Sequence, residues 1–273
     1  MIHSAHSCVG AGMIRLFHVS DIHFGAEDAG ALAWFEACVA KERPDAVVMT
    51  GDLTMRARSH EFEEAGEWLA SLGVPVTVEV GNHDLPYFNP FARIAQPYRR
   101  YRKVERLVER PLDIKGVAIV PLRTTARFQW RLNWSKGHVS GKQLAKTLAI
   151  IDGIDKETAI LVACHHPLID QGTHSSGDTT GGAEALAALA RAGADAVLTG
   201  HVHDPFDVEH EVDGAPIRLI GAGTLSERTR ASPPAFNELR IAQGEIETIL
   251  RTMSPLPEIE LPVEEGVEIE TAG

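Results

Sequence analysis

Strand-like runs of apolar and β-branched residues alternate with segments of helical periodicity over the first 200 residues, and this alternation restricts the fold more than any other feature. The strand-like runs cover residues 14–19, 46–49, 74–80, 117–121, 159–163 and 194–198. The segments with apolar residues at helical spacing cover residues 31–40, 60–72, 142–151 and 183–192. A β-α-β order of this kind predicts an α/β protein that contains parallel strands.

The pattern changes after Pro205, where short strand-like runs follow one another without helices between them. These runs cover residues 206–212, 217–220, 235–241 and 245–251. Asp213-Gly214 and Gln243-Gly244 separate them in pairs, and such polar-glycine dipeptides are typical of hairpin turns. The C-terminal part therefore adds antiparallel strands, and we predict two mixed sheets packed together with helices outside.

The chain of 273 residues fits one large α/β domain, which we place at residues 13–253. Residues 1–12 show no periodicity and precede a second methionine, so we expect an unstructured extension and a natural start at Met13. Residues 254–273 are rich in Pro and Glu, which predicts a mobile acidic tail.

The stretch 86–115 interrupts the α/β rhythm with aromatic and basic residues. One interpretation is a cap insertion that covers a functional site. The other is a solvated amphipathic helix with Val104, Leu107 and Val108 turned inward, which is the more common origin of a charge run.

The charge balance and the cysteines restrict partners and location. The formal net charge is −12, and six acidic residues fall in the last twenty positions, so the body of the chain is acidic as well. An acidic body lacks the positive field that binding of nucleic acid usually needs, so we expect no nucleic-acid partner. Three cysteines at no metal or disulfide spacing, and no apolar run of about 18 residues, predict a cytoplasmic protein without a membrane span. The oligomeric state has no sequence signal.

Potential metal ligands follow the ends of the predicted strands. They are Asp21 and His23, Asp52, Asn82 and His83, His165 and His166, and His201 and His203. In α/β sheets the loops beyond the carboxyl ends of the strands meet in one crevice. Five separate segments are therefore expected to bring oxygen and nitrogen ligands to one place.

The spacing within the pairs supports this convergence. Residues two apart in an extended segment point to the same side, so Asp21 with His23, and His201 with His203, are expected to face one cluster. Carboxylate and amide oxygens combined with imidazole nitrogens suit manganese, iron or zinc better than magnesium.

The ordered blocks between Leu16 and His203 resemble those of the calcineurin-like metallophosphoesterases: Asp-x-His, Gly-Asp, Gly-Asn-His-Asp, a lone His and Gly-His-x-His. The resemblance implies a four-layer α-β-β-α sandwich and a centre of two metal ions. By resemblance, one ion is held by Asp21, His23, Asp52 and His203, and the other by Asp52, Asn82, His165 and His201. Asp52 is then the bridging carboxylate. We choose His165 over His166 because His165-His166-Pro167 matches the His-x-Pro pattern of the family.

The same resemblance implies a catalytic mechanism. A hydroxide that bridges the two ions attacks the phosphorus. His83 contacts the phosphate beside Asn82 and protonates the leaving oxygen, and Asp84 orients His83. His174 lies in a Gly-, Ser- and Thr-rich loop and is a further candidate for substrate binding.

The substrate class follows from smaller features. Residues 18–23, 51–54 and 137–144 resemble the class III cyclic nucleotide phosphodiesterase branch more than the protein phosphatases, and Met55 replaces the Tyr ligand of purple acid phosphatases. We therefore predict a phosphodiesterase for a small phosphodiester such as a cyclic nucleotide. The alternatives are a DNA or RNA nuclease, a phosphomonoesterase, and a non-catalytic scaffold that kept the fold.

Overall fold

The structure is a computed structural model that describes residues 12–86, 89–109, 112, 114–126, 135–173, 177, 179–230 and 232–253. The expected N-terminal extension, apart from Gly12, and the expected tail 254–273 lie outside the described residues, and so does His174. The domain boundaries stay predictions.

Ten strands and six helices form the described part of the chain. The strands are β1 (Ile14–Val19), β2 (Ala46–Met49), β3 (Val76–Val78), β4 (Val117–Pro121), β5 (Ala159–Ala163), β6 (Ala196–Thr199), β7 (Phe206–Val212), β8 (Ala215–Gly221), β9 (Ala235–Ala242) and β10 (Glu245–Thr252). The helices are α1 (Ala29–Glu42), α2 (Ser59–Ser71), α3 (Pro90–Ala95), α4 (Tyr101–Val108), α5 (Gly141–Ile151) and α6 (Gly182–Arg191).

The strands form two five-stranded sheets, and both sheets are mixed. The first has the order β10-β9-β1-β2-β3, in which β1, β2 and β3 run parallel and β9 pairs antiparallel with β1 and β10. The second has the order β4-β5-β6-β8-β7, in which only the pair β7 and β8 is antiparallel. The prediction of two mixed sheets is confirmed. The two C-terminal hairpins separate, because β7–β8 extends the second sheet and β9–β10 extends the first.

The alternation of side chains along each strand produces the four layers. Leu16 of β1 packs between the sheets with Leu161 of β5 and Leu198 of β6. Its neighbour Phe17 points to the opposite face and packs against Phe35 of α1. Successive residues of a strand face opposite sides of the sheet, so each strand contributes to two cores.

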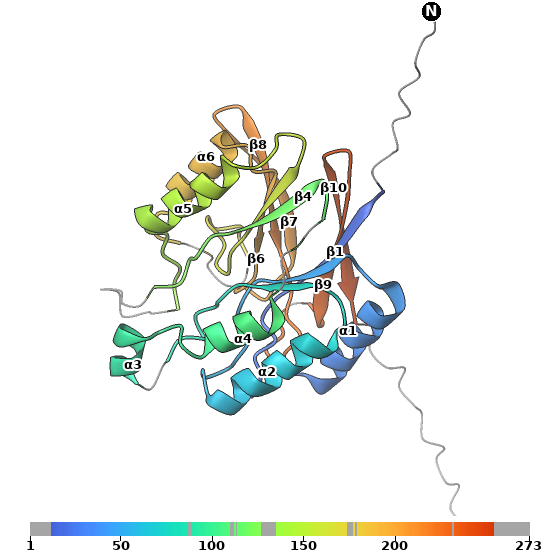
Figure 1. The fold of residues 1–273 in the computed structure, drawn as a ribbon, viewed down its shortest axis with the longest axis vertical. Helices are drawn as coiled ribbons and strands as arrows, with labels where there is room; N and C mark the ends of the chain where they lie inside the picture. The colour runs from blue at the N-terminus through green and yellow to red at the C-terminus, as the bar shows by residue number, and fades with distance from the viewer. Residues whose placement is uncertain are drawn as a thin grey trace, which may run out of the picture.

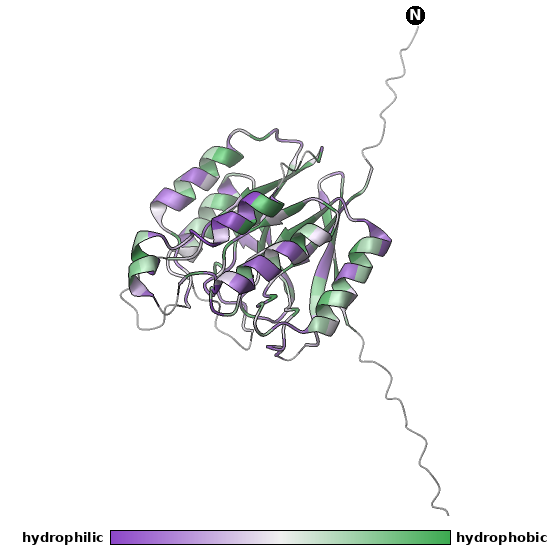
Figure 2. Cartoon of the chain, turned by 60° about the horizontal axis from the view of Figure 1, so that its bottom comes forward, coloured by the Kyte–Doolittle hydropathy of each residue, from purple (hydrophilic) through white to green (hydrophobic). Residues whose placement is uncertain are grey.

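The helices cover the outer faces of the sheets. The helices α1, α2 and α4 lie on the first sheet, and α5 and α6 lie on the second (Figure 1). The strands are mostly hydrophobic, whereas each helix carries hydrophobic and hydrophilic residues side by side (Figure 2). The expected α-β-β-α sandwich is therefore confirmed.

The segment predicted as either a cap or a solvated helix contains α3 and α4. Val104 and Val108 of α4 are buried against α2, as expected, but Leu107 is 49% exposed, so its predicted inward position is wrong. The Tyr101 hydroxyl donates a hydrogen bond of 2.7 Å to the carbonyl of Val78, which ties α4 to the edge strand β3. A role as a cap stays a prediction. In the described part of the chain, no helix has both the length and the apolar character needed to cross a membrane.

Candidate metal centre

The candidate ligands lie just beyond the carboxyl ends of strands in both sheets. Asp21 follows β1 and Asp52 follows β2, whereas His165 follows β5 and His201 follows β6. A direct contact links the two sheets here, because the Asp21 carboxylate accepts a 2.8 Å hydrogen bond from the backbone N–H of His201. The cluster therefore belongs to neither sheet alone.

Five of the candidate ligands adopt a left-handed backbone conformation. The φ angles are 56° at Asp21, 46° at His23, 54° at Asp52, 71° at His201 and 62° at His203. Residues other than Gly, Asn and Asp rarely adopt this conformation, and such strain concentrates at functional sites. The expectation that these pairs lie in extended segments is wrong. The strands end before them, and the backbone turns sharply to aim the side chains.

The first group of acceptors contains Asp21, His23 and His203. The Nε2 atoms of the two histidines lie 3.2 Å apart. The Oδ1 atom of Asp21 lies 3.1 Å from His203 Nε2 and 3.5 Å from His23 Nε2. All three side chains are buried, so three ligand atoms enclose a small space that is shielded from solvent.

The second group contains Asp52, Asn82 and His165. His165 Nε2 lies 3.3 Å from Asp52 Oδ2 and 3.1 Å from Asn82 Oδ1. The same Asp52 Oδ2 lies 3.8 Å from His23 Nε2 in the first group. Asp52 thus stands between the two groups, which is the position that a shared carboxylate requires.

Backbone carbonyls determine which nitrogen of each histidine faces the cluster. The Nδ1 atoms of His23, His165 and His203 lie 3.4, 2.8 and 2.7 Å from the carbonyls of Thr54, Thr50 and Arg228. A carbonyl only accepts, so each Nδ1 carries a proton and each Nε2 presents a lone pair to the carboxylates. Lone pairs that converge in this way need a cation between them, and neutral histidines fixed by such partners are typical metal ligands. The residues present fit a metal centre.

The pKa shifts agree with a site for positive charge. Burial would raise the pKa of Asp21, but His203 and His23 hold it well below its usual range. Burial would lower the pKa of His165, but the Asp52 carboxylate raises it to about 9. The carboxylates thus stay charged and attract either protons or metal ions to the Nε2 atoms.

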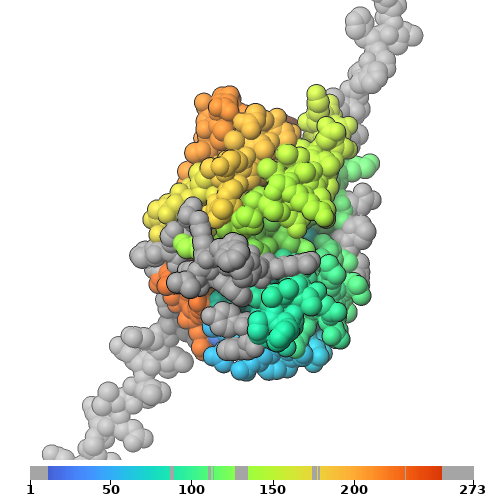
Figure 3. All heavy atoms as spheres, turned by 90° about the vertical axis from the view of Figure 1, so that its left-hand side faces the viewer, coloured from blue at the N-terminus to red at the C-terminus, as the bar shows by residue number. Residues whose placement is uncertain are grey.

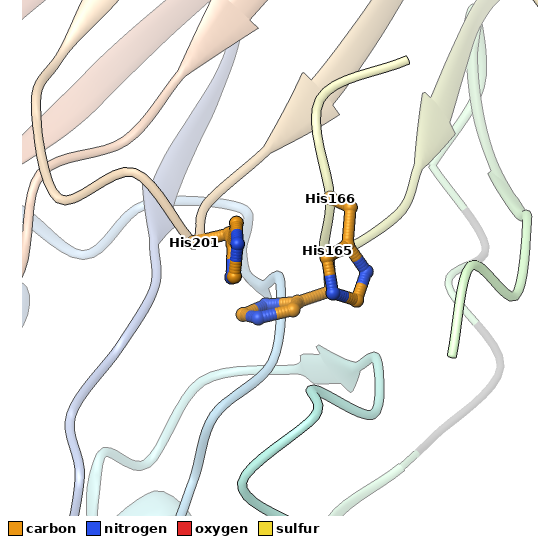
Figure 4. Close-up of side chains that lie close together, drawn as sticks. All are labelled: His165, His166 and His201. Atoms are coloured by element: carbon orange, nitrogen blue, oxygen red, sulfur yellow. The ribbon is translucent and has the colours of Figure 1, made fainter. Parts of the chain in front are cut away.

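His165 and His166 differ in what their rings contact. His166 Nε2 lies 2.9 Å from the carbonyl of Ser135, and its Nδ1 lies 2.8 Å from the hydroxyl of Thr124, so both nitrogens already have partners. His165 instead turns toward Asp52. His201 lies beside both rings, with ligand nitrogens of the three histidines within 4.8 Å of one another (Figure 4). This geometry favours His165 as the ligand.

His83 and Asp84 are placed differently from each other. The ring of His83 lies edge-on to His23 at a centroid distance of 4.9 Å, and its Nδ1 is 2.8 Å from the carbonyl of Met55. Asp84 is expected from the sequence to orient His83, but it accepts hydrogen bonds from the backbone N–H groups of Thr54 and Gly81, both at 2.9 Å. Burial raises the pKa of Asp84 to about 7. In the structure, Met55 orients His83, and Asp84 holds two strand-end loops together.

Sequence reasoning missed Arg228. Its carbonyl anchors His203, and its guanidinium lies beside His83. The only signal in the sequence is the polar segment after β8, where Gly221 to Thr224 indicates a turn. An arginine seven residues beyond a strand has no distinctive spacing, so the contact depends on the path of the loop.

Comparisons with known proteins show which family the chain resembles. A family model for calcineurin-like phosphoesterases matches residues 14–205. A glycerophosphodiester phosphodiesterase of Enterobacter lignolyticus is 26% identical over 180 residues, which are 58% of this chain and 58% of that protein. A component of the nuclease SbcCD from Staphylococcus epidermidis is 24% identical over 221 residues, which are 72% of this chain and 59% of that protein. The chain thus spans less than two thirds of either relative.

A structural neighbour shares the fold. The purple acid phosphatase PPD1 from seeds of yellow lupin, Lupinus luteus, superposes with a TM-score of 0.64 at 12% sequence identity. The match covers 89% of this chain and 52% of that one.

Proposed function

The chain belongs to the calcineurin-like phosphoesterase family, and from this premise we propose that it hydrolyses a small phosphodiester at a centre of two transition-metal ions. Membership of this family implies metal-dependent hydrolysis of a phosphate ester. The observation that carries the proposal is the pair of acceptor groups that share Asp52. Two adjacent cation sites with a common carboxylate are what a dinuclear phosphoesterase needs.

The ligand sets follow from the two groups. Asp21, His23, Asp52 and His203 would hold one ion, and Asp52, Asn82, His165 and His201 would hold the other. The mixture of imidazole nitrogen with carboxylate and amide oxygen suits manganese, iron or zinc. When bound, such ions acidify water to a pKa of about 7 and offset the charge of the phosphate.

The protein side chains have separate tasks. His83 is half-buried at the edge of the cluster, and the carbonyl of Met55 fixes its Nδ1 proton. Its Nε2 would therefore deliver the proton that the departing alkoxide needs. The backbone N–H of His83 donates a 2.8 Å hydrogen bond to Asp52 Oδ1, so the loop that carries the acid also holds the shared carboxylate.

The surroundings support a substrate larger than phosphate. A cavity of about 460 Å³ lies between Asp84 and the segment that contains α3 and the start of α4. This segment, in blue-green, lies on the face that Figure 3 shows. Arg99, Arg100 and Lys103 line the cavity, so it favours an anionic substrate. The similarity to a glycerophosphodiester phosphodiesterase and the class III-like blocks support a small diester such as a cyclic nucleotide.

A nuclease is the second candidate, because the same three cations could contact a nucleic-acid backbone and one relative is a component of a nuclease. The net charge of −12 argues against it.

The first prediction concerns the substrate. Protein reconstituted with Mn²⁺, Fe²⁺ or Zn²⁺ is assayed with a model diester, a monoester, a cyclic nucleotide, a glycerophosphodiester and single-stranded DNA. We expect the highest kcat/KM for one of the small diesters. The matched variant His83→Ala should keep its metal and lose at least about 100-fold in kcat, because it lacks the acid.

The outcomes separate the alternatives. Preference for the monoester contradicts the diester assignment, and preference for DNA supports the nuclease. Wild-type protein that retains no transition metal after reconstitution would show a non-catalytic scaffold. Unchanged kcat in His83→Ala removes the proposed role of that residue.

A further inference from the structure

The guanidinium of Arg228 lies at the edge of the candidate metal centre. Its NH1 atom is 3.2 Å from His83 Nε2 and 3.5 Å from His23 Nε2. The same atom is 3.8 Å from the sulfur of Met55. The residue is half-buried, so part of it is exposed to solvent.

The backbone fixes where this side chain starts. The hydroxyl of Ser226 accepts a hydrogen bond of 3.3 Å from the N–H of Arg228, and the N–H of Glu227 donates to the carbonyl of Ala26 at 3.1 Å. The carbonyl of Arg228 in turn accepts the Nδ1 proton of His203. The backbone of the loop is therefore held at Glu227 and at Arg228 independently of the guanidinium.

The guanidinium lies beside two nitrogen atoms that have other roles in the proposed site. His23 would hold a metal ion, and His83 would protonate the leaving group. A guanidinium has only donors, and the atoms that it faces here are the Nε2 atoms of His83 and His23. Among the described residues, no carboxylate forms an ion pair with Arg228. A half-buried cation at the edge of the candidate metal centre, without a carboxylate partner among the described residues, is complementary to an anion.

We propose that Arg228 binds a non-bridging oxygen of the substrate phosphate from the side of His83. The inference rests on the proposed function and adds a residue that recognises the charge of the substrate. An oxygen that lies between the two side chains would accept a hydrogen bond from the Arg228 guanidinium in place of the contact with His83 Nε2.

The geometry allows the side chain to be tested separately from the metal ligands. Arg228→Met keeps the length of the side chain and its packing against Met55, and it leaves intact the carbonyl that anchors His203. Arg228→Lys keeps the charge. Arg191→Met is the matched control, because Arg191 lies at the C-terminus of α6, away from the carboxyl end of β6, and pairs with Asp213 on the surface.

The experiment measures three quantities on metal-reconstituted protein: metal content, the Kd of inorganic phosphate by calorimetry, and the KM and kcat for the best diester. We expect R228M to keep its metal while its phosphate Kd and its KM rise at least about tenfold, the equivalent of about 1.4 kcal/mol. R228K should stay within about threefold of the wild type, because the charge is retained. R191M should match the wild type.

The outcomes decide between explanations. Unchanged phosphate affinity in R228M overturns the proposal, and so does a loss of metal in both R228M and R228K, which would show that the residue only positions His203. If R228M does not fold, Arg228→Gln takes its place, and unchanged phosphate affinity in that variant overturns the proposal in the same way. Wild-type protein that binds phosphate through Arg228 but hydrolyses no ester refutes the proposed function and leaves the binding role intact.

Discussion

At the scale of single residues, His18 shows how the interior beside the site is kept neutral. His18 is fully buried between the sheets, three residues before Asp21. The amide nitrogen of Asn237 donates to the carbonyl of Gly221 and lies 3.4 Å from His18 Nδ1, whereas His18 Nε2 lies 3.1 Å from the hydroxyl of Thr50. Nδ1 is thus an acceptor, and a second proton on the ring would face another donor. Burial lowers the pKa of His18 to about 3.

The second prediction follows from this pKa. The unfolded chain takes up a proton on His18 below pH 6.5, but the folded protein does not, so folding stability is complete above that pH and is lost as the pH falls toward 3. At pH 5 the loss from this one residue is about 2 kcal/mol. We expect His18→Gln, which cannot be protonated, to lose less stability than the wild type between pH 7.5 and pH 5.

The measurement is urea unfolding of both metal-free proteins at the two pH values. The difference isolates His18, because the other histidines of the cluster are common to both proteins. Parallel losses of stability in the two proteins would contradict the neutral, buried state of His18.

The side chains that could ligate a metal were predictable from the sequence, but their supports were not. Asp21 and Asp52 each follow a predicted strand, and a carboxylate at that position indicates a possible metal ligand. The carbonyls of Thr50, Thr54 and Arg228 have no such signal, since every residue has a carbonyl. The positions of these carbonyls depend on the left-handed turns. Among the residue types in these segments, only glycine indicates such a turn.

At the scale of elements, the loop after the third strand is fitted closely to the loop after the second. Gly81 has no space for a side chain, because an added Cβ would collide with the carboxylate and the backbone nitrogen of Asp52. Gly81 also donates its N–H to Asp84, which in turn accepts from the Asp52 loop through Leu53. Any substituent at residue 81 must therefore displace the shared carboxylate.

The third prediction tests this close approach. Gly81→Ala should lose at least one of the two metal equivalents, because Asp52 would move away from both acceptor groups. Gly141→Ala is the control, since a Cβ at that first position of α5 meets no atom within 4 Å. Metal content by elemental analysis and far-UV circular dichroism check the two variants. A full metal complement in Gly81→Ala would contradict the assigned role of Asp52.

The elements themselves were mostly predictable, and the exceptions have local causes. The alternating runs located the parallel strands, because strands that are buried on both faces need continuous apolar residues. The run 74–80 predicted a strand of seven residues, but β3 is limited to Val76–Val78. Glu79 interrupts the apolar run, and burial raises the pKa of its carboxyl to about 8. The local sequence does not predict which sheet each C-terminal hairpin joins, because that choice depends on contacts between strands far apart in the chain.

At the scale of the whole molecule, the candidate centre joins the two sheets. Asp21 and Asp52 come from the first sheet, and His165 and His203 come from the second. The histidines of one sheet therefore complete the ligand sets of the other. The core between the sheets is made of side chains such as Leu16 and Leu161, but the carboxylates at its end repel one another unless cations lie between them.

The fourth prediction is that metal binding stabilises the packing of one sheet on the other. A ligand that binds only the folded protein adds about 2.7 kcal/mol at a free concentration of 100 times Kd, which corresponds to roughly 5 to 10 °C in Tm for a chain of this size. We expect a Tm increase of that order on addition of Mn²⁺ or Zn²⁺, and its reversal by a chelator.

The control for this stabilisation is Asp52→Asn, which keeps the shape of the side chain and its hydrogen bond from the N–H of His83 while it removes the shared charge. Its Tm in the absence of metal can differ from that of the wild type, because His165 loses the carboxylate that raises its pKa. The metal-induced change in Tm is therefore the quantity to compare. If Asp52→Asn shows the same increase in Tm as the wild type, the ions bind elsewhere. Both proposed ligand sets include the Asp52 carboxylate, so its loss must weaken metal binding at this centre.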